Sequence, residues 1–416
     1  MNAEVVSIGD ELLIGQVVNT NQAYIAEKLN SVGIAVVQMT TVGDNPAEIL
    51  TALRSAWTRY DIVSVTGGLG PTHDDVTRGV ICEFFGIGLV RDDHSLETIR
   101  KLFAARGLPL TRKNEDQALV PAGCVVIPNN QGTAPGYFFE RDGKFMFVLP
   151  GVPFEMKGMM ESFVIPAFAQ KIKGSYVLHK TLKTTGIAES ILADQIGDVG
   201  SLFSQNSGIS LAYLPSPPGV RLRISVRSTS REEAQAKISE VEKKIRTKAQ
   251  KYLYGEGDEE LEDVVGRLLA ERGWTIAVAE SCTGGLIMDR ITNVSGSSRY
   301  FERGFVTYSN ASKTAELGVL ESLIEKHGAV SREVAVAMAE GVRQSAATNI
   351  GISTTGIAGP TGGTDDKPVG LVWIGFSSSE KTFAMKFNFG NDRRRFKERA
   401  SQAALELVRR VLLNIE

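Results

Sequence analysis

The chain has 416 residues, and at about 100–200 residues per domain this length predicts two to four domains. Hydrophobic residues make up 43% of the chain and charged residues 23%, an ordinary globular mixture that excludes wholesale disorder. With 46 Lys and Arg against 48 Asp and Glu, the net charge of −2 excludes a polycation built to coat nucleic acid.

Neither a membrane span nor a disulfide framework is expected. No run approaches the ~18 apolar residues of a spanning helix, and residues 1–10 lack the basic and apolar regions of a secretory signal. The three cysteines, Cys82, Cys124 and Cys282, are isolated and odd in number, which is typical of a reducing compartment. The sequence therefore predicts a cytoplasmic protein.

The first part of the chain alternates strands with helices. Strands are expected at 4–8, 34–41 and 62–66, helices at 21–31 and from Asn45-Pro46 onward, and a hairpin over 137–149. Asn45 can cap free N–H groups, and Pro46 fits the first helical position. This order indicates a parallel sheet covered by helices on both faces, with ligands at the carboxyl ends of its strands.

The middle part has a different pattern and a basic composition. Strands are expected at 176–184, 209–214 and 220–227, and helices at 187–196 and 230–251. Residues 171–254 hold 14 Lys or Arg and 7 Asp or Glu. This part is therefore expected to be a small, positively charged α+β domain.

The last part returns to an α/β pattern. Helices are expected at 260–270, 331–346 and 392–413, and strands at 275–279, 352–355, 369–376 and 382–389. The predicted fold is thus two three-layer α/β/α domains with mostly parallel sheets, 1–170 and 255–416, joined by the small α+β domain 171–254. Two separate α/β domains suggest two active sites.

A glycine-rich loop follows the strand expected at 62–66. Thr66, Gly67, Gly68, Gly70 and Thr72 lie in it, and a helix is expected from about Val76. Such loops turn backbone N–H groups inward at a helix N-terminus, a geometry that suits phosphate, although the same loop also serves as a plain tight turn. The dinucleotide fingerprint G-x-G-x-x-G is absent, which disfavours a nicotinamide-dependent dehydrogenase.

Acidic residues lie near the same expected edge of the sheet. Asp74 and Asp75 offer the hard oxygen ligands that a divalent cation such as Mg²⁺ prefers, or a helix cap. Asp10 and Glu11 follow the first strand and can coordinate metal or ribose hydroxyls.

The carboxy-terminal part contains a candidate nucleophile. Ser281 lies between an expected strand and an expected helix start, where free N–H groups can stabilise an oxyanion or where a serine simply caps the helix. His327, at an expected helix end, is the only histidine of this part, so a Ser-His-Asp triad is disfavoured. Cys282 is a rival nucleophile, but a lone cysteine among small residues is more typical of packing.

The same part supplies partners for a serine nucleophile. Lys313 can lose its proton near neutral pH if desolvated, Tyr308 can relay a proton, and Thr355 can donate a hydrogen bond. Glycines around these positions admit a ligand close to the backbone, and Arg393, in a basic run, can bind a substrate phosphate. Lys313 also has an ordinary explanation as a solvated surface lysine, and the arginine run as an exposed helix face.

These residues carry a resemblance to the CinA family of competence/damage-inducible proteins over essentially the whole chain. In the first domain it rests on 7–13, 19–21, 66–72 with Asp74-Asp75, and 149–153. In the last domain it rests on 279–285, 306–310 with Lys313, and 355–360. The first domain resembles molybdopterin-binding domains, the middle resembles a KH-like linker, and the last resembles nicotinamide-nucleotide amidases.

The resemblance implies a bifunctional pyridine-nucleotide salvage enzyme. Its first domain would cleave ADP-ribose at the pyrophosphate with a divalent metal such as Mg²⁺ held by Asp74 and Asp75. The implied substrate-binding residues of this domain are Asp10, Glu11, Asn21, Thr66, Gly67, Gly68, Gly70 and Thr72.

In the last domain, Ser281 would attack the carboxamide of nicotinamide mononucleotide, with Lys313, Tyr308 and Thr355 as its partners. The products would be ammonia and nicotinic acid mononucleotide, and no cofactor is implied. The implied binding residues are Thr283, Gly284, Gly285, Gly356, Gly359 and Arg393. The amidase pattern has Gly-Asp-Arg where this chain reads Gly390-Asn391-Asp392-Arg393, so which arginine meets the phosphate stays open.

Two other readings remain. The first is a molybdopterin-related binding or biosynthetic protein that uses the amino-terminal loop. The second is a nucleic-acid-binding protein that uses the basic middle domain, where 197–200 matches the KH G-x-x-G pattern but carries Asp198 toward the phosphates. The favoured expectation is a homodimer that acts on small nucleotides, with no membrane partner.

Overall fold

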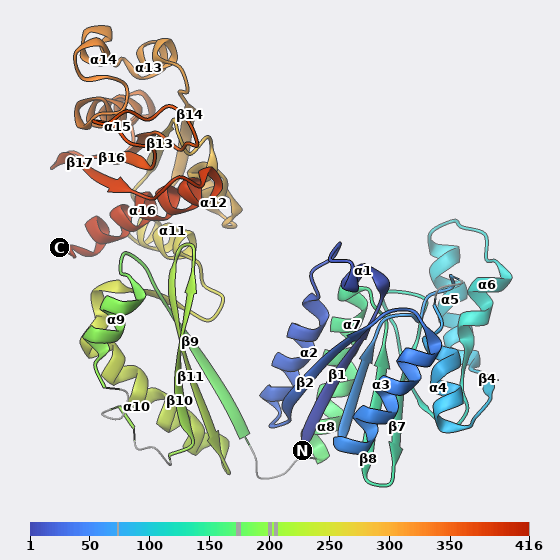
Figure 1. The fold of residues 1–416 in the computed structure, drawn as a ribbon. Coiled ribbons are helices and arrows are strands. Elements are labelled where there is room, and N and C mark those ends of the chain that lie inside the picture. The colour runs from blue at the N-terminus through green and yellow to red at the C-terminus, as the bar shows by residue number, and fades with distance from the viewer. Residues whose placement is uncertain (73–74, 172–175, 199–201, 204–206, 416) are drawn as a thin grey trace. The chain divides into compact units, whose positions relative to one another are not determined.

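In a computed structural model, described for residues 1–72, 75–171, 176–198, 202–203 and 207–415, the chain is a mixed α/β protein with 45% helix and 26% strand. It forms two compact units, Met1–His179 with Val226–Lys237, and Lys180–Ser225 with Ile238–Glu416. Figure 1 shows the helices and strands of each part in chain order. Within the described ranges, no helix is long and apolar enough to cross a membrane.

A six-stranded sheet in the order β2-β1-β3-β8-β7-β6 forms the amino-terminal domain. Its strands are β1 (Asn2–Ile8), β2 (Ala35–Val42), β3 (Ile62–Thr66), β6 (Val125–Ile127), β7 (Gly136–Arg141) and β8 (Lys144–Leu149). β2, β1, β3 and β8 are parallel, and β7 and β6 add antiparallel pairs at one edge. The expected hairpin is confirmed, with Asp142 and Gly143 in the left-handed region that its turn requires.

Helices cover both faces of this sheet because successive side chains of a strand point to opposite faces. In β1, Ala3 and Val5 pack with Ile25 of α2, whereas Val6 and Ile8 pack with Leu53 of α3. The helices of this domain are α1 (Asp10–Leu13), α2 (Thr20–Ser31), α3 (Pro46–Arg59), α4 (Thr77–Phe85), α5 (Asp93–Ala105), α6 (Arg112–Glu115), α7 (Pro153–Met159) and α8 (Ile165–Lys171), with a small sheet of β4 (Leu89–Arg91) and β5 (Leu119–Pro121). The three-layer prediction is confirmed.

The middle of the chain forms a four-stranded sheet in the order β10-β11-β9-β12. Its elements are β9 (Tyr176–Thr184), α9 (Glu189–Ile196), β10 (Ile209–Ser216), β11 (Gly219–Ser228), α10 (Arg231–Ala249) and β12 (Leu253–Glu256). Gly197 ends α9, but the G-x-x-G pattern continues through residues 199–200, which lie outside the described residues.

A five-stranded sheet in the order β14-β13-β15-β16-β17 forms the carboxy-terminal domain (Figure 1). Its strands are β13 (Ile276–Glu280), β14 (Phe301–Val306), β15 (Ile350–Gly356), β16 (Leu371–Ser377) and β17 (Thr382–Asn388). β14, β13 and β15 are parallel, so their carboxyl ends meet at one edge, while β16 and β17 are antiparallel. This edge is where a parallel sheet presents its ligand-binding loops.

Two apolar layers enclose this five-stranded sheet. On one face, Val278 of β13 packs with α11 (Leu261–Arg272) and α16 (Arg393–Leu413), and on the other, Ala279 packs with α15 (Arg332–Ala346). The remaining helices are α12 (Leu286–Asn293), α13 (Asn310–Leu317) and α14 (Glu321–His327). α15 and α16 are capped by the residues at the start of their expected segments: Ser331 accepts from Val334 N, and Asp392 accepts from Arg394 N.

Candidate functional site

A cavity of about 260 Å³ opens at the carboxyl ends of β13, β14 and β15. It is lined by Ser281, Cys282, Tyr308, Asn310, Lys313, Ala329, Val330, Thr355, Gly356, Ile357, Ala358, Gly359, Thr361 and Arg393. Five separate chain segments therefore meet at one edge of the sheet. Asn310 belongs to the 306–310 motif of the family resemblance, whereas Ala329 and Val330 line the cavity without any motif that singles them out.

Ser281 and Lys313 lie side by side in this cavity. Lys313 Nζ is 3.3 Å from Ser281 Oγ and 2.8 Å from the backbone oxygen of Thr307, with the Tyr308 and Ser309 oxygens at 3.5 and 3.4 Å. Lys313 is 1% exposed and Ser281 8%. α13 holds the lysine: the Ser309 side chain caps the first turn, and Lys313 shares the buried face of the helix with Leu317, one turn later. The structure thus brings the two predicted residues together.

The surroundings of Lys313 favour its neutral amine. Burial lowers the pKa of Lys313, because removal from water disfavours the charged form of the amine. A neutral amine has two N–H groups and one lone pair. In the structure Lys313 Nζ donates to the Thr307 oxygen and to Ser281 Oγ; once neutral, the amine would keep its N–H groups for the carbonyl oxygens and turn its lone pair toward the Ser281 hydroxyl.

Cys282 is a weaker candidate for the nucleophile of this domain, and His327 a weaker candidate for its base. Burial raises the pKa of the Cys282 thiol to about 12, so the thiol stays protonated and is a weak nucleophile. His327 ends α14 and pairs with Glu333 at 3.6 Å; it is not among the described residues that line the cavity. The expectation that Ser281 lacks a histidine partner agrees with this placement.

Tyr308 and Arg393 form the polar rim of the cavity. Arg393 donates from Nη2 to Tyr308 Oη at 2.8 Å and from Nη1 to the Gly359 oxygen at 3.0 Å. Tyr308 is 62% exposed, and its hydroxyl is bonded to Arg393 and not to the Ser281–Lys313 pair. The rim residue therefore holds an arginine, and the expected proton relay through Tyr308 is not what its contacts support.

The expectation that Ser281 begins a helix is wrong. α12 begins at Leu286 with Gly285 as its N-cap, and Ser281 N donates to the Thr354 oxygen at 3.0 Å, so this N–H is not free for an oxyanion. The helix is capped instead by Glu280, a fully buried carboxylate that accepts from Gly285 N and Met288 N at 2.8 and 2.9 Å. A glutamate that ends an otherwise apolar strand was the only sequence signal for this role.

The other predicted residues of this domain fall into two groups. Gly356 and Gly359 line the cavity, and so does Thr355, whose hydroxyl donates to the Ala329 oxygen at 2.8 Å. Thr283, Gly284 and Gly285 are not among the described lining residues. Thr283 is fully buried and bonded to Thr354 at 2.7 Å, so it holds the Ser281 loop from inside the domain, whereas Gly284 is exposed. Direct contact of these three residues with substrate stays a prediction.

The amino-terminal loops meet around Asn21. Its Nδ2 donates to Thr66 Oγ1 at 3.3 Å and to the Gly151 oxygen at 2.8 Å, and Thr66 Oγ1 donates to the Pro150 oxygen. Asn21 Oδ1 is buried and has no hydrogen-bond partner within the described residues. Because a buried acceptor left unpaired costs free energy, this atom marks a place where a ligand donor would be stabilising.

The glycine-rich loop is packed against its own domain. A Cβ at Gly67 would lie 2.1 Å from the Ile8 oxygen, and one at Gly68 would lie 2.2 Å from Thr77 Oγ1. Gly70 approaches Asp75, whose Oδ2 accepts from Thr72 N at 2.9 Å and from the Thr72 hydroxyl. These contacts support the tight-turn reading of the loop, and its phosphate reading stays a prediction.

The predicted metal ligands do not make up a site by themselves. Asp75 holds the Thr72 turn, and Asp74 lies outside the described residues. Asp10 is exposed and exchanges hydrogen bonds with Asp44 through the two backbone N–H groups, while Glu11 is exposed beside Gly9. Over the described parts of the chain, no three His, Cys, Asp or Glu side chains gather as a metal site would require.

Comparisons with known proteins match three successive stretches of the chain. Residues 4–170 match a probable molybdopterin binding domain, 179–255 the damage-inducible protein CinA KH domain, and 258–412 the CinA C-terminal domain. A putative competence-damage inducible protein of Caldicellulosiruptor saccharolyticus is 44% identical over 414 residues, with 100% of both chains covered. A CinA-like protein of Chloroherpeton thalassium is 46% identical over 99% of both chains.

A crystal structure of the protein CinA from Thermoplasma acidophilum is 38% identical, covers 39% of this chain and 95% of its own, and has a TM-score of 0.37. The full-length identity to curated relatives carries the assignment, together with the three domain matches. The chain therefore belongs to the CinA family of competence/damage-inducible proteins.

Proposed function

We propose that the carboxy-terminal domain is an amide hydrolase with a Ser281–Lys313 dyad, and that it deamidates nicotinamide mononucleotide to nicotinic acid mononucleotide and ammonia. The observation that carries the proposal is a fully buried lysine amine 3.3 Å from a serine hydroxyl at the wall of an open cavity. A serine is a weak nucleophile until an adjacent base takes its proton, and the only amine at this distance is that of Lys313 among the described residues.

The first half-reaction forms an ester. Ser281 Oγ attacks the carboxamide carbon while its proton moves to the lone pair of Lys313 Nζ. The amine becomes an ammonium, and the carbonyl oxygens of Thr307, Tyr308 and Ser309 stabilise that charge. When the tetrahedral intermediate collapses, the C–N bond breaks, the ammonium returns a proton to the leaving nitrogen, and ammonia departs.

The second half-reaction regenerates the serine. Lys313, neutral again, takes a proton from water, and the resulting hydroxide attacks the ester carbon. The C–Oγ bond breaks, and Lys313 returns the proton to Ser281 Oγ. The sum is the addition of one water to one amide, with no cofactor required by the balance.

The rim residues fit the phosphate end of such a substrate. Arg393 uses Nη1 and Nη2 for Gly359 and Tyr308, which orients the guanidinium over the mouth of the cavity. Arg394 and Arg395 follow it in the first turn of α16, and their side chains are exposed. A guanidinium can bind phosphate through two parallel hydrogen bonds, so this end of α16 is suited to a mononucleotide.

The decisive test is ammonia release from nicotinamide mononucleotide. Ser281→Ala removes the nucleophile and should lower the rate by roughly 10³-fold or more. Cys282→Ala, at the adjacent position, is the matched control and should retain the rate within a few-fold. Residual activity of Ser281→Ala within a few-fold of wild type, or loss only in Cys282→Ala, would reject the assigned nucleophile.

A second candidate function belongs to the amino-terminal domain, namely cleavage of ADP-ribose at its pyrophosphate with a divalent metal. The unpaired Asn21 Oδ1 supports a ligand with a hydrogen-bond donor, such as a ribose hydroxyl, at the junction of the strand-end loops. Molybdopterin-related binding is the alternative for the same loops. ADP-ribose hydrolysis that is abolished by chelator and restored by Mg²⁺ would support the first function. Absence of ADP-ribose hydrolysis both with and without Mg²⁺ would favour the second.

A further inference from the structure

The second compact unit holds another cavity, which shares no residue with the Ser281 cavity. Its volume is about 650 Å³, within the 300–1,000 Å³ that is common for small-molecule sites. Its walls come from residues 185–189 and 215–220 of the KH domain, from the outer strand β17 with Phe389 just beyond it, and from the second half of α16.

One face of α16 forms the floor. Residues 399, 402, 403, 406, 407 and 410 line the cavity, a spacing of three and four that puts them on one side of a helix. The opposite side, with Phe396, Ala400, Ala404 and Val408, is buried in the domain core. Ala403 and Leu407 make the middle of the floor apolar, and Arg399 and Arg410 stand at its two ends.

The wall formed by β17 is aromatic. Phe387 and Phe389 are half-buried, and their rings stack at 5.5 Å with an angle of 15° between their planes. Met385, on the same side of the strand as Phe387, is 41% exposed. Aromatic faces and a polarisable thioether form a surface on which a planar ring packs well.

The charged groups around the cavity leave a positive balance. Arg399 has no hydrogen bond or ion pair within the described part of the chain, and Arg410 uses only Nε, for Glu406 Oε1 at 2.8 Å. Glu406 is also bound by the buried Arg409, through two hydrogen bonds of 2.6 and 2.9 Å. Glu189 is the remaining acid of the lining. Unused guanidinium N–H groups therefore face a cavity whose main carboxylate is already neutralised.

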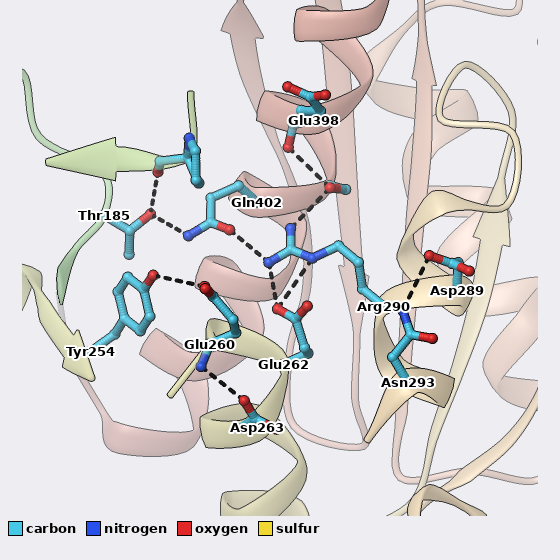
Figure 2. Close-up of polar contacts among 12 residues, drawn as sticks. Thr185, Tyr254, Glu260, Glu262, Asp263, Asp289, Arg290, Asn293, Glu398 and Gln402 are labelled. Carbon is cyan, nitrogen blue, oxygen red and sulfur yellow. Dashed lines mark hydrogen bonds and ion pairs between the residues drawn. The ribbon is translucent and has the colours of Figure 1, made fainter. Parts of the chain in front are cut away.

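Buried polar groups fix the floor in place. Gln402 Oε1 accepts from Arg290 Nη2 at 2.8 Å, and its Nε2 donates to Thr185 Oγ1 of the KH domain at 3.2 Å. Figure 2 shows this chain of contacts, in which Arg290 also binds Glu262. Thr185 and Gln402 are 2% and 3% exposed. Because Thr185 and Gln402 already have hydrogen-bond partners, the arginines and the aromatic rings are the groups that can select a ligand in this cavity.

We propose that this cavity is a ligand site for a small organic anion that carries a planar aromatic ring. The ring packs against Phe387 and Phe389 and the apolar floor, and the carboxylate, sulfonate or phosphate group binds the Arg399 guanidinium. Such a ligand touches the KH domain and the carboxy-terminal domain at once. The proposal does not depend on the reaction assigned to Ser281.

The test uses the full-length protein and the aromatic sulfonate 8-anilinonaphthalene-1-sulfonate, whose fluorescence rises on apolar surfaces. We expect saturable binding to one site per chain. Arg399→Glu should weaken that binding at least tenfold, because it replaces the attraction with repulsion. Arg303→Glu, the same change on an exposed arginine of the same domain that lines neither cavity, should leave the affinity within twofold.

Ala403→Phe tests the apolar half of the proposal without changing charge. A ring at this position fills the floor, so we expect loss of the saturable signal while the melting temperature stays near that of wild type. Unsaturable binding by the wild-type protein, or equal affinity of wild type and Arg399→Glu, overturns the proposal. If Ala403→Phe does not fold, the comparison of Arg399→Glu with Arg303→Glu still decides the proposal.

Discussion

The amino-terminal and carboxy-terminal sheets present loops in the same way but differ in what those loops bury. At the carboxyl ends of β13 and β14, an ionisable side chain, Lys313, is almost completely removed from water beside a hydroxyl. At the corresponding edge of the first sheet, the buried groups are the neutral Asn21 and Thr66, while the carboxylate of Asp10 is exposed.

This difference shows that bringing loops together and making a side chain reactive are separate properties of a domain. Parallel strands that end together bring loops together in both domains, which is a property of topology. Reactivity at neutral pH needs an ionisable group whose pKa has shifted toward neutrality, and burial is a cause of such a shift. The carboxy-terminal domain is therefore expected to act through its own residues, whereas the amino-terminal domain depends on what its ligand brings.

The largest effect is expected from removing the base. Lys313→Met keeps most of the side-chain volume and should lower ammonia release by roughly 10²–10⁴-fold, the usual contribution of a general base. Lys313→Arg keeps a cation but cannot give up its proton, so it should be as inactive as the methionine variant. Steady-state rates on nicotinamide mononucleotide measure both. Substantial activity in Lys313→Arg would mean that the charge, and not the lone pair, is what the reaction uses.

The next effect is a pH dependence set by Lys313. The reaction uses the neutral amine, so kcat/KM should fall about tenfold per pH unit below the lowered pKa of Lys313 and level off above it. The free energy of unfolding should also increase as the pH rises. The unfolded lysine titrates near 10.4, so between the two pKa values the unfolded chain binds more protons, and stability rises with pH there.

Lys313→Met is the control for the thermal measurement, since melting temperatures followed across that pH range should lose the rise in this variant. A flat pH profile of kcat/KM in the wild-type protein would contradict the proton-transfer role.

An intermediate effect should separate the two domains. Asp75→Ala should lower metal-dependent ADP-ribose cleavage by about tenfold or more, in the range seen when groups around a metal are removed, and leave ammonia release unchanged. Asp75→Asn distinguishes the two roles of this carboxylate, because the amide oxygen can still accept from Thr72 N but carries no charge. Full ADP-ribose cleavage by Asp75→Asn would assign Asp75 to the turn alone.

The smallest effect is expected at the rim. Tyr308→Phe removes the hydroxyl that accepts from Arg393 at 2.8 Å, in an exposed position. KM for nicotinamide mononucleotide should rise about two- to tenfold, the size of one ordinary net hydrogen bond in an exposed position, with little change in kcat. A large fall in kcat with KM unchanged would instead support a proton relay through Tyr308.

Local signals in the sequence were sufficient where a residue acts on its own neighbours. Asn45, Ser331 and Asp392 cap the helices that follow them, as their positions before apolar-periodic segments indicate. The same reasoning failed at Ser281, where the serine before a helix looked like a cap. The cap is the Glu280 carboxylate, and it reaches Gly285 N and Met288 N only because the intervening residues form a turn.

The sequence by itself determined the alternation of strands and helices, the helix caps and the presence of a serine, a lysine and glycine loops at strand ends. These follow from interactions within a few residues. The tertiary structure decided that Lys313 is buried 3.3 Å from Ser281, that Tyr308 holds Arg393, and that Thr283 lies behind the site. Distances and desolvation arise from packing between segments that are far apart in the chain, and local patterns carry no information about them.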